Sequence, residues 1–242
     1  MNKKRLDRET FSRGLVSSRS QAESYIKLGK VKMDGKVVTK PGLLVGAEAK
    51  ISLDGGQQYV SRAALKLASV TEPLDLNFQG KTVLDVGSST GGFTDFALRA
   101  GAKRVVAVDV GTDQMHPALR GDPRIELHEK TDIRNLTPKD GTWKIDIVVA
   151  DVSFISLREV LPAISRLSKS GTQIVVLLKP QFEAGKDQIN RGIVKNDKLR
   201  RQILKDFENW AKDHFVIAGK ADSKVAGAHG NLERFYLLRP KA

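Results

Sequence analysis

The chain has 242 residues, and its 41 Lys and Arg against 28 Asp and Glu give a formal net charge of +13. It has no cysteine, which excludes disulfides, thiolate metal sites and a cysteine nucleophile. Its hydrophobic content of 40% is enough for a packed core, but no stretch approaches the ~20 apolar residues of a membrane span. The charged first residues do not resemble a secretory signal, so we expect a cytoplasmic protein whose basic surface suits a polyanion.

Residues 6–53 carry a pattern of their own, with two short helices ahead of a small sheet. Residues 6–15 predict the first helix. Ser20 and Glu23 have the spacing of a capping box for the second helix, which Gly29 ends. We therefore expect a small α+β unit at the N-terminus.

The small sheet is predicted by a turn dipeptide between apolar runs. Asp34 and Gly35 form a favoured hairpin turn, and residues 49–53 predict a further strand. Two basic helices leading into a hairpin suit RNA binding, although the same pattern also fits an ordinary solvated charged face. The side chains expected to face phosphates are Arg5, Arg8, Arg13, Arg19, Lys27 and Lys30.

Residues 6–42 resemble the S4 RNA-binding domain. The matching positions are Leu6, Asp7, Ser18, Arg19, Ala22, Gly29, Val31, Lys40 and Pro41. The acid-x-Ile pattern of the family is looser here, because two residues separate Glu48 from Ile51. The expected domains are an S4-type RNA-binding domain at 1–53, a linker at 54–60, and a second domain at 61–242.

A strand, a glycine turn, a helix and another strand follow one another over residues 82–111, and each strand ends in an acidic residue. Asp109 lies 17 residues beyond Gly92, where an acid normally accepts hydrogen bonds from adenosine ribose hydroxyls. Both dinucleotide and S-adenosylmethionine sites produce this pattern. The absence of G-x-G-x-x-G and the presence of Asp85, which can hold a methionine ammonium, favour S-adenosylmethionine. The predicted cofactor-binding residues are Asp85, Gly87, Ser88, Ser89, Gly91, Gly92, Phe93, Asp109, Val110, Asp132 and Ile133.

Apolar strands and helices alternate beyond the glycine turn, which predicts a doubly wound α/β sheet with ligands at the carboxyl ends of its strands. Asp151 and Lys179 each end a strand, and a buried lysine is costly unless it is paired. Lys179 could instead tip into solvent at the strand end. Lys66 lies within an apolar helical stripe, where it could instead be a surface lysine whose ammonium reaches the solvent. Glu233 could instead be an ordinary carboxylate at the edge of the sheet.

Lys66, Asp151, Lys179 and Glu233 resemble the Lys-Asp-Lys-Glu tetrad of ribose 2′-O-methyltransferases of the FtsJ-like class. With the S4-like region ahead of them, the chain resembles the TlyA family, also called hemolysin A, over nearly its whole length. The strings that carry this resemblance are SRAALKL, LDVGSSTGGFTD, DVSFISL, LLKPQFE and HGNLERFYLL. The linker departs from the Trp-containing tetrapeptide of actinobacterial members, because residues 57–60 read QQYV.

The resemblance implies a Rossmann-like methyltransferase fold, S-adenosyl-L-methionine as cofactor, and 2′-O-methylation of cytidine in ribosomal RNA. Its target is the small subunit and, in some members, also the large subunit. The implied partners are ribosomal RNA or ribosomal subunits, and we expect a monomer with no metal, no membrane and no DNA partner. The competing interpretations are a nonenzymatic RNA-binding or ribosome-assembly factor, a membrane-active hemolysin and an NAD-dependent oxidoreductase.

The residues themselves favour a ribose acceptor over a base. Methylation at pyrimidine carbon 5 usually needs a cysteine, and base-nitrogen methylation commonly uses Asp/Asn-Pro-Pro-Tyr, whereas Asp151 is followed by Val-Ser-Phe. We expect Lys179 to lie nearest the 2′-oxygen, as general base or as stabiliser of the developing alkoxide, with Asp151 orienting it. Lys66 and Glu233 would position the ribose and balance the charge. Because only RNA has a 2′-hydroxyl, this acceptor also selects RNA over DNA.

Overall fold

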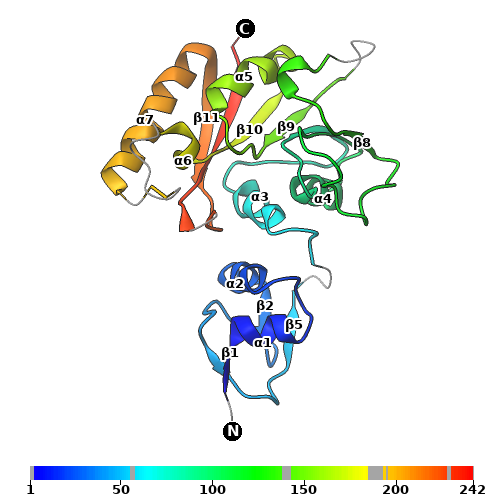
Figure 1. Cartoon of the computed structure of the whole chain (residues 1–242), viewed down its shortest axis with the longest axis vertical. Coiled ribbons are helices and arrows are strands. Elements are labelled where there is room, and N and C mark those ends of the chain that lie inside the picture. The colour runs from blue at the N-terminus through cyan, green and yellow to red at the C-terminus, as the bar shows by residue number, and fades with distance from the viewer. Residues whose placement is uncertain are drawn as a thin grey trace.

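The computed structural model describes residues 3–54, 58–137, 143–184, 193–194, 196–227 and 230–241. Figure 1 shows a small N-terminal domain below a larger α/β domain, with helix α3 at the side of the larger domain that faces the smaller one. Residues 55–57 of the predicted linker lie outside the described residues. The rest of the linker is tied to both domains, because Tyr59 N donates to Tyr25 Oη at 2.9 Å and Val60 N donates to Asp95 Oδ2 at 2.9 Å.

The N-terminal domain contains two helices packed on short strands. Strand β2 lies between β3 and β5 in an antiparallel sheet, and β1 pairs separately with β4, a pairing that the sequence patterns did not predict. The elements are β1 Lys4–Arg5, α1 Leu6–Ser12, α2 Arg19–Lys27, β2 Val31–Met33, β3 Lys36–Val37, β4 Leu44–Val45 and β5 Ile51–Leu53. The predicted hairpin turn is confirmed, since both of its central residues have positive φ.

The helix ends of this domain differ in part from the prediction. Helix α1 ends three residues early, where Gly14 takes a left-handed φ of 71°. Ser18 is the N-cap of α2, because its side chain accepts a hydrogen bond from Gln21 N at 3.1 Å, so the prediction of Ser20 was wrong. Gly29 follows the end of α2 with a φ of 68°, as predicted.

The larger domain is built on a seven-stranded sheet with the order β11-β12-β10-β9-β6-β7-β8. The strands from β10 to β8 in this order run parallel, whereas β12 is antiparallel to both of its neighbours. The strands are β6 Thr82–Val86, β7 Arg104–Val108, β8 Ile125–His128, β9 Ile147–Ala150, β10 Gln173–Leu178, β11 Phe215–Asp222 and β12 Arg234–Pro240. The predicted doubly wound α/β architecture is therefore confirmed, with one reversed strand inserted beside β10.

Helices cover both faces of this sheet. Successive strand residues point to opposite faces, so Val83 packs toward α3 and α4, whereas Leu84 packs toward α5 and α7. The helices are α3 Ala63–Thr71, α4 Gly92–Arg99, α5 Leu157–Arg166, α6 Pro180–Glu183, α7 Asp197–His214 and the 3₁₀ helix η1 Ile133–Asn135. Among the described residues, no helix has the length and apolar character needed to span a bilayer.

Candidate active site

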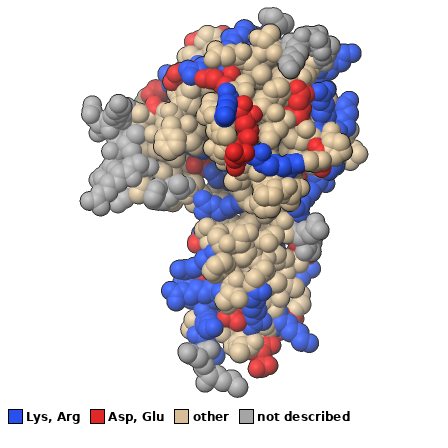
Figure 2. Space-filling view, turned by 45° about the vertical axis from the view of Figure 1, so that its right-hand side comes forward, with Lys and Arg blue, Asp and Glu red and all other residues tan. Residues whose placement is uncertain are grey.

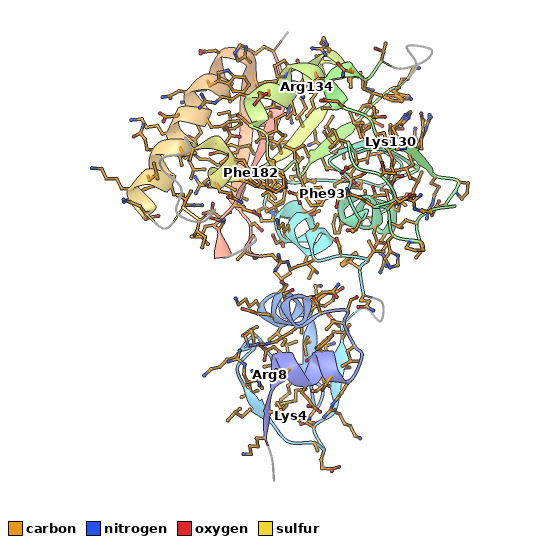
Figure 3. All side chains as sticks on the ribbon, viewed as in Figure 1. Lys4, Arg8, Phe93, Lys130, Arg134 and Phe182 are labelled. Carbon is orange, nitrogen blue, oxygen red and sulfur yellow. The ribbon has the colours of Figure 1, made fainter. Side chains whose placement is uncertain are left out.

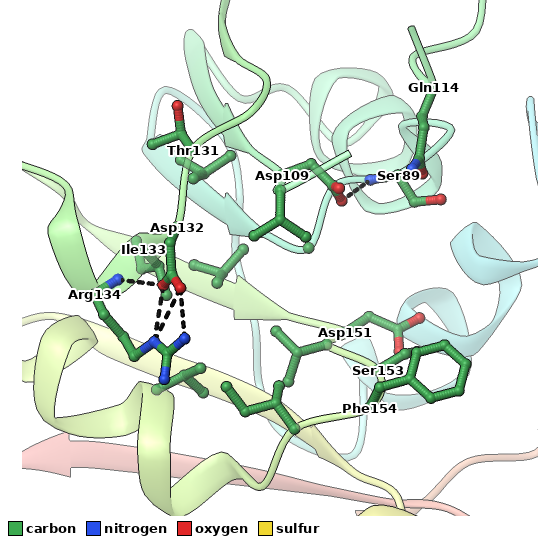
Figure 4. Close-up of a pocket in the computed structure, with 17 residues that line it drawn as sticks. Ser89, Asp109, Gln114, Thr131, Asp132, Ile133, Arg134, Asp151, Ser153 and Phe154 are labelled. Carbon is green, nitrogen blue, oxygen red and sulfur yellow. Dashed lines mark hydrogen bonds and ion pairs between the residues drawn. The ribbon is translucent and has the colours of Figure 1, made fainter. Parts of the chain in front are cut away.

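A cavity of about 510 Å³ opens at the carboxyl ends of β6, β7 and β9. This is the edge of a parallel sheet where ligands of doubly wound folds bind. Figure 4 shows that Asp109 and Ser89 lie on one side, Asp132 and Arg134 on another, and Asp151 with Ser153 on a third. A smaller cavity of about 140 Å³ continues between the glycine turn and Lys179.

Two positions of the turn require glycine, each for a different structural reason. Gly87 has a φ of 78°, and a Cβ there would lie 3.1 Å from the backbone oxygen of Asp151, so only glycine allows the ends of β6 and β9 to approach. Gly91 has a φ of 85°, and a Cβ there would collide with Met115 and Leu119. Gly91 therefore serves packing behind the cavity, and it is absent from the residues that line either cavity.

The carboxylate of Asp109 is fixed at the cavity wall. Its Oδ2 accepts a hydrogen bond from Ser89 N at 2.8 Å, and its Oδ1 accepts one from Gly111 N at 2.7 Å. Asp132 caps the 3₁₀ helix and is held by the guanidinium of Arg134 at 2.6 Å, which lowers the pKa of that carboxyl. Both acids therefore present oriented carboxylate oxygens to the cavity.

Asp85 lies deeper, beneath the glycine turn, and its side chain has 0% exposure. Thr94 Oγ1 donates to Asp85 Oδ2 at 2.6 Å, but the described residues offer no hydrogen-bond partner to Asp85 Oδ1 or to the buried hydroxyl of Ser88. Burial raises the pKa of Asp85 to about 7. Such orphaned oxygens are costly, so they mark a place where a cationic or hydrogen-bonding ligand would be stabilised.

The remaining predicted cofactor residues divide between the two cavities. Val110 and Ile133 line the larger cavity, and Val110 is exposed. Gly92 and Phe93 line the smaller cavity together with Ser88. The structure thus brings the predicted set, except Gly91 and the deeper Asp85, onto the walls of two adjoining cavities.

Four charged side chains from four segments converge beside these cavities. Lys66 Nζ lies 2.6 Å from Glu233 Oε2, although 167 positions separate the two residues. Lys179 Nζ lies 2.7 Å from Asp151 Oδ1, and Lys66 Nζ lies 4.0 Å from Asp151 Oδ2. Asp151 and Lys179 directly follow β9 and β10, Lys66 lies on α3, and Glu233 precedes β12.

The burial of this cluster excludes the surface interpretations of its members. Lys66, Lys179 and Glu233 are all buried, so Lys179 does not tip into solvent and Glu233 is not an edge carboxylate. Burial acts to raise the pKa of Asp151, but the ammonium groups of Lys66 and Lys179 outweigh it and hold this pKa below its usual value. Two ammonium groups and two carboxylates make the cluster neutral, which makes its burial tolerable.

Sequence reasoning missed two residues of the segment after β9. Lys179 Nζ donates a hydrogen bond to Ser153 Oγ at 2.7 Å, and Ser153 lines both cavities. Phe154 has a φ of 64° and 91% exposure, and its ring centroid lies 5.1 Å from that of Phe182. Their position directly after a strand that ends at the ligand edge was the available signal.

The predicted RNA-binding residues fall into two groups. In the first, side chains form contacts within the domain: Arg5 and Arg19 both bind the buried Asp7, at 3.0 and 2.8 Å. Arg13 pairs with an acid on α1 and donates to two backbone carbonyls, and Lys27 pairs with an acid on α2. These cations help to build the domain, and Arg5, Arg13 and Arg19 keep only part of their donor capacity for an external anion.

Arg8 and Lys30 form the second group. Both are exposed, and no ion pair joins either of them to an acid within the described part of the chain. Figure 3 places Arg8 and Lys4 in the N-terminal domain, well away from Phe93 and Phe182. Figure 2 shows further Lys and Arg side chains over the same domain. Contact of these residues with RNA stays a prediction.

Comparisons with known proteins agree with this geometry. The FtsJ-like methyltransferase family matches residues 59–240, and the S4 domain matches residues 4–51. The 16S/23S rRNA (cytidine-2′-O)-methyltransferase TlyA of Mycobacterium tuberculosis is 41% identical over 239 residues, which cover 97% of this chain and 89% of that protein. Hemolysin A of Brachyspira hyodysenteriae is 35% identical, over 95% of this chain and 97% of that protein.

A solved structure that matches the whole of this chain supports the same family. A protein from Streptococcus thermophilus, described as a candidate hemolysin, is 38% identical and superposes with a TM-score of 0.73, covering 100% of this chain and 90% of that one. The chain therefore belongs to the FtsJ-like methyltransferase family, in the TlyA branch that its sequence resembles, and it carries an S4 domain.

Proposed function

We propose that this protein transfers a methyl group from S-adenosylmethionine to the 2′-oxygen of a cytidine ribose in ribosomal RNA. The observation that carries the proposal is the convergence of Lys66, Asp151, Lys179 and Glu233 beside the cavity at the carboxyl edge of the sheet. The name of the Mycobacterium tuberculosis relative supports the substrate and the position of the methyl group. The small subunit is the proposed target, and the large subunit is an additional target that the same name supports.

The residues of the cavity fit an S-adenosylmethionine group. Asp85 Oδ1 is the orphaned acceptor that would bind the ammonium of the methionine part, and the Asp109 carboxylate would accept hydrogen bonds from the ribose hydroxyls. Asp132 and Ile133 would contact the adenine. When bound, the group supplies an electrophilic methyl on a sulfonium.

The chemistry assigned to the chain is positioning and proton management. Methyl transfer needs the acceptor oxygen in line with the methyl group, and correct alignment supplies a large part of the rate. Lys179 would contact the 2′-oxygen, as general base or as stabiliser of the developing alkoxide, while Asp151 holds its ammonium. Lys66 and Glu233 would orient the ribose and keep the cluster neutral.

The S4 domain supplies the proposed RNA affinity. We propose that residues 1–53 bind ribosomal RNA through basic side chains including Arg8 and Lys30, that residues 54–60 act as the linker, and that residues 61–242 carry the reaction. Phosphate contacts of this type act without reading sequence. The proposed enzyme acts as a monomer, and its ribosomal substrate places it in the cytoplasm.

The test compares two lysine variants with purified ribosomal subunits and radiolabelled methyl donor. Lys179→Ala is expected to abolish methyl transfer and to leave RNA binding intact, whereas Lys205→Ala, an exposed lysine of α7, serves as the matched control. Mapping of 2′-O-methyl groups in ribosomal RNA with and without the protein then identifies the nucleotide. Label on a base, or full activity of Lys179→Ala, would contradict the proposal.

A further inference from the structure

The segment of residues 223–227, after β11, is bound to the backbone around Glu233. Ser223 N donates a hydrogen bond to Glu233 O at 3.0 Å, and Gly227 N donates one to Asn231 O at 2.9 Å. A Cβ on Gly227 would collide with the Glu233 carboxylate. The 223–227 segment therefore sets where Glu233 can lie.

The same segment is hydrogen-bonded to the helix that carries Lys66. Lys224 N donates to Ser69 Oγ at 3.3 Å, and Ser69 Oγ donates to Lys66 O at 2.7 Å. Ser69 is buried on α3, less than one turn beyond Lys66. This relay links the backbones of Lys66 and Glu233 independently of the ion pair between their side chains.

Two apolar residues beside this relay belong to the core of the S4 domain. Leu65 and Val225 are 1% and 3% exposed, and they lie in the same hydrophobic cluster as Leu6, Tyr25 and Ile26. Leu65 directly precedes Lys66, and consecutive helical residues point about 100° apart. Helix α3 therefore presents one side chain to the S4 core and the next to the charged cluster, consistent with its place between α2 and the sheet in Figure 1.

We propose that packing of the S4 domain on Leu65 and Val225 positions the Lys66–Glu233 pair for methyl transfer. The S4 domain then contributes to turnover as well as to RNA affinity. Val225 and Ser69 are positioning residues, because neither lines the two cavities of the active site and both act through the backbones that carry the pair. Small displacements of a catalytic group are enough to slow a reaction that depends on alignment. The inference rests on the proposed function.

Ser69→Ala in the full chain removes the relay with little change of volume, and alanine is favourable within a helix. It is expected to lower kcat about fivefold, the factor that corresponds to about 1 kcal/mol for one lost positioning hydrogen bond. The KM for ribosomal RNA and the Kd of S-adenosylmethionine are expected to stay unchanged. A merely structural role would leave kcat of the folded enzyme unchanged.

Val225→Ala tests the S4 contact itself, and Val216→Ala is its matched control, because Val216 is an exposed valine of β11. We expect Val225→Ala to lower kcat as Ser69→Ala does, and Val216→Ala to behave as wild type. The double variant Ser69→Ala with Val225→Ala should be close to the more severe single variant, because both changes release the same segment. If Val225→Ala does not fold, Ser69→Ala decides by itself.

The outcomes separate this inference from the proposed function. Wild-type protein that transfers no methyl group to ribosomal RNA would remove the proposed function whatever the variants do. Active wild type with unchanged kcat in Ser69→Ala would overturn the positioning role and leave the proposed function intact. A raised KM for RNA with unchanged kcat would likewise overturn it, because the S4 contact would then serve binding alone.

Discussion

Replacement of Asp85 by asparagine tests how much the ionisation of this buried carboxyl lowers the free energy of unfolding. Burial raises the pKa of Asp85 from an ordinary 3.8 to about 7, so the unfolded chain releases this proton at lower pH than the folded protein does. The stability that the protonated group contributes is complete below about pH 4 and is lost as the pH rises through about 7. At 1.36 kcal/mol for each pKa unit, the loss amounts to ~4 kcal/mol above pH 7.

The measurement is the free energy of unfolding in urea, from pH 5 to pH 8, for cofactor-free protein. Between these limits the Asp85 contribution predicts that wild type loses about 2–3 kcal/mol more than Asp85→Asn. Asparagine keeps the shape of the side chain and an oxygen for the hydroxyl of Thr94. Asp213→Asn, on the exposed side of α7, controls for the loss of a carboxyl and should follow wild type.

The raised pKa of Asp85 also makes cofactor binding depend on pH. An ammonium beside Asp85 Oδ1 favours the ionised carboxyl, so the affinity of wild type should rise from pH 6 through about pH 7 and level off near ~pH 8. The Asp85→Asn variant should bind more weakly and without this rise, as measured by calorimetry. Equal slopes of unfolding free energy against pH in wild type and Asp85→Asn would refute the reasoning.

Three further predictions follow from the same geometry. Asp109→Ala should raise the cofactor Kd, measured by calorimetry, by roughly 10- to 100-fold, because hydrogen bonds to charged groups contribute ~1.5–3 kcal/mol. An unchanged Kd would mean that the ribose is held elsewhere. Gly227→Ala should lower kcat by about tenfold or more without weakening cofactor binding, because the new methyl group displaces the Glu233 carboxylate. Wild-type turnover in this variant would show that residue 227 does not set the position of Glu233. Combined replacement of Arg8 and Lys30 by alanine should reduce, by ~1 to 2, the magnitude of the slope of the logarithm of the RNA association constant against the logarithm of the salt concentration. An unchanged slope would mean that neither residue contacts the RNA.

Much of the fold could be predicted from the sequence because its signals are local. The glycine turn after β6, the hairpin turn at Asp34-Gly35 and the end of α2 at Gly29 each depend on φ angles that only a few residue types adopt readily. The alternation of apolar strands and helices in the larger domain predicted its class in the same way. The resemblance to known families then assigned roles to residues within these local patterns.

Other features were decided only by tertiary contacts. The guanidinium of Arg19 on α2 binds the buried Asp7 on α1, 12 positions earlier, whereas the pattern alone assigned Arg19 to phosphate contact. Gly91 carries the same signal as a glycine beside a ligand, yet it packs behind the cavity. In each case the outcome depends on a neighbour from another segment, which a local pattern does not contain.

The sequence by itself determined which elements form and which strand ends carry charge. The tertiary structure decided that Lys66 and Glu233, 167 positions apart, form a buried ion pair, and that the 223–227 segment joins their backbones to the core of the S4 domain. The physical reason is the range of the interactions. Capping, turns and periodicity act over a few residues, whereas burial and charge pairing depend on which distant surfaces the folded chain brings together.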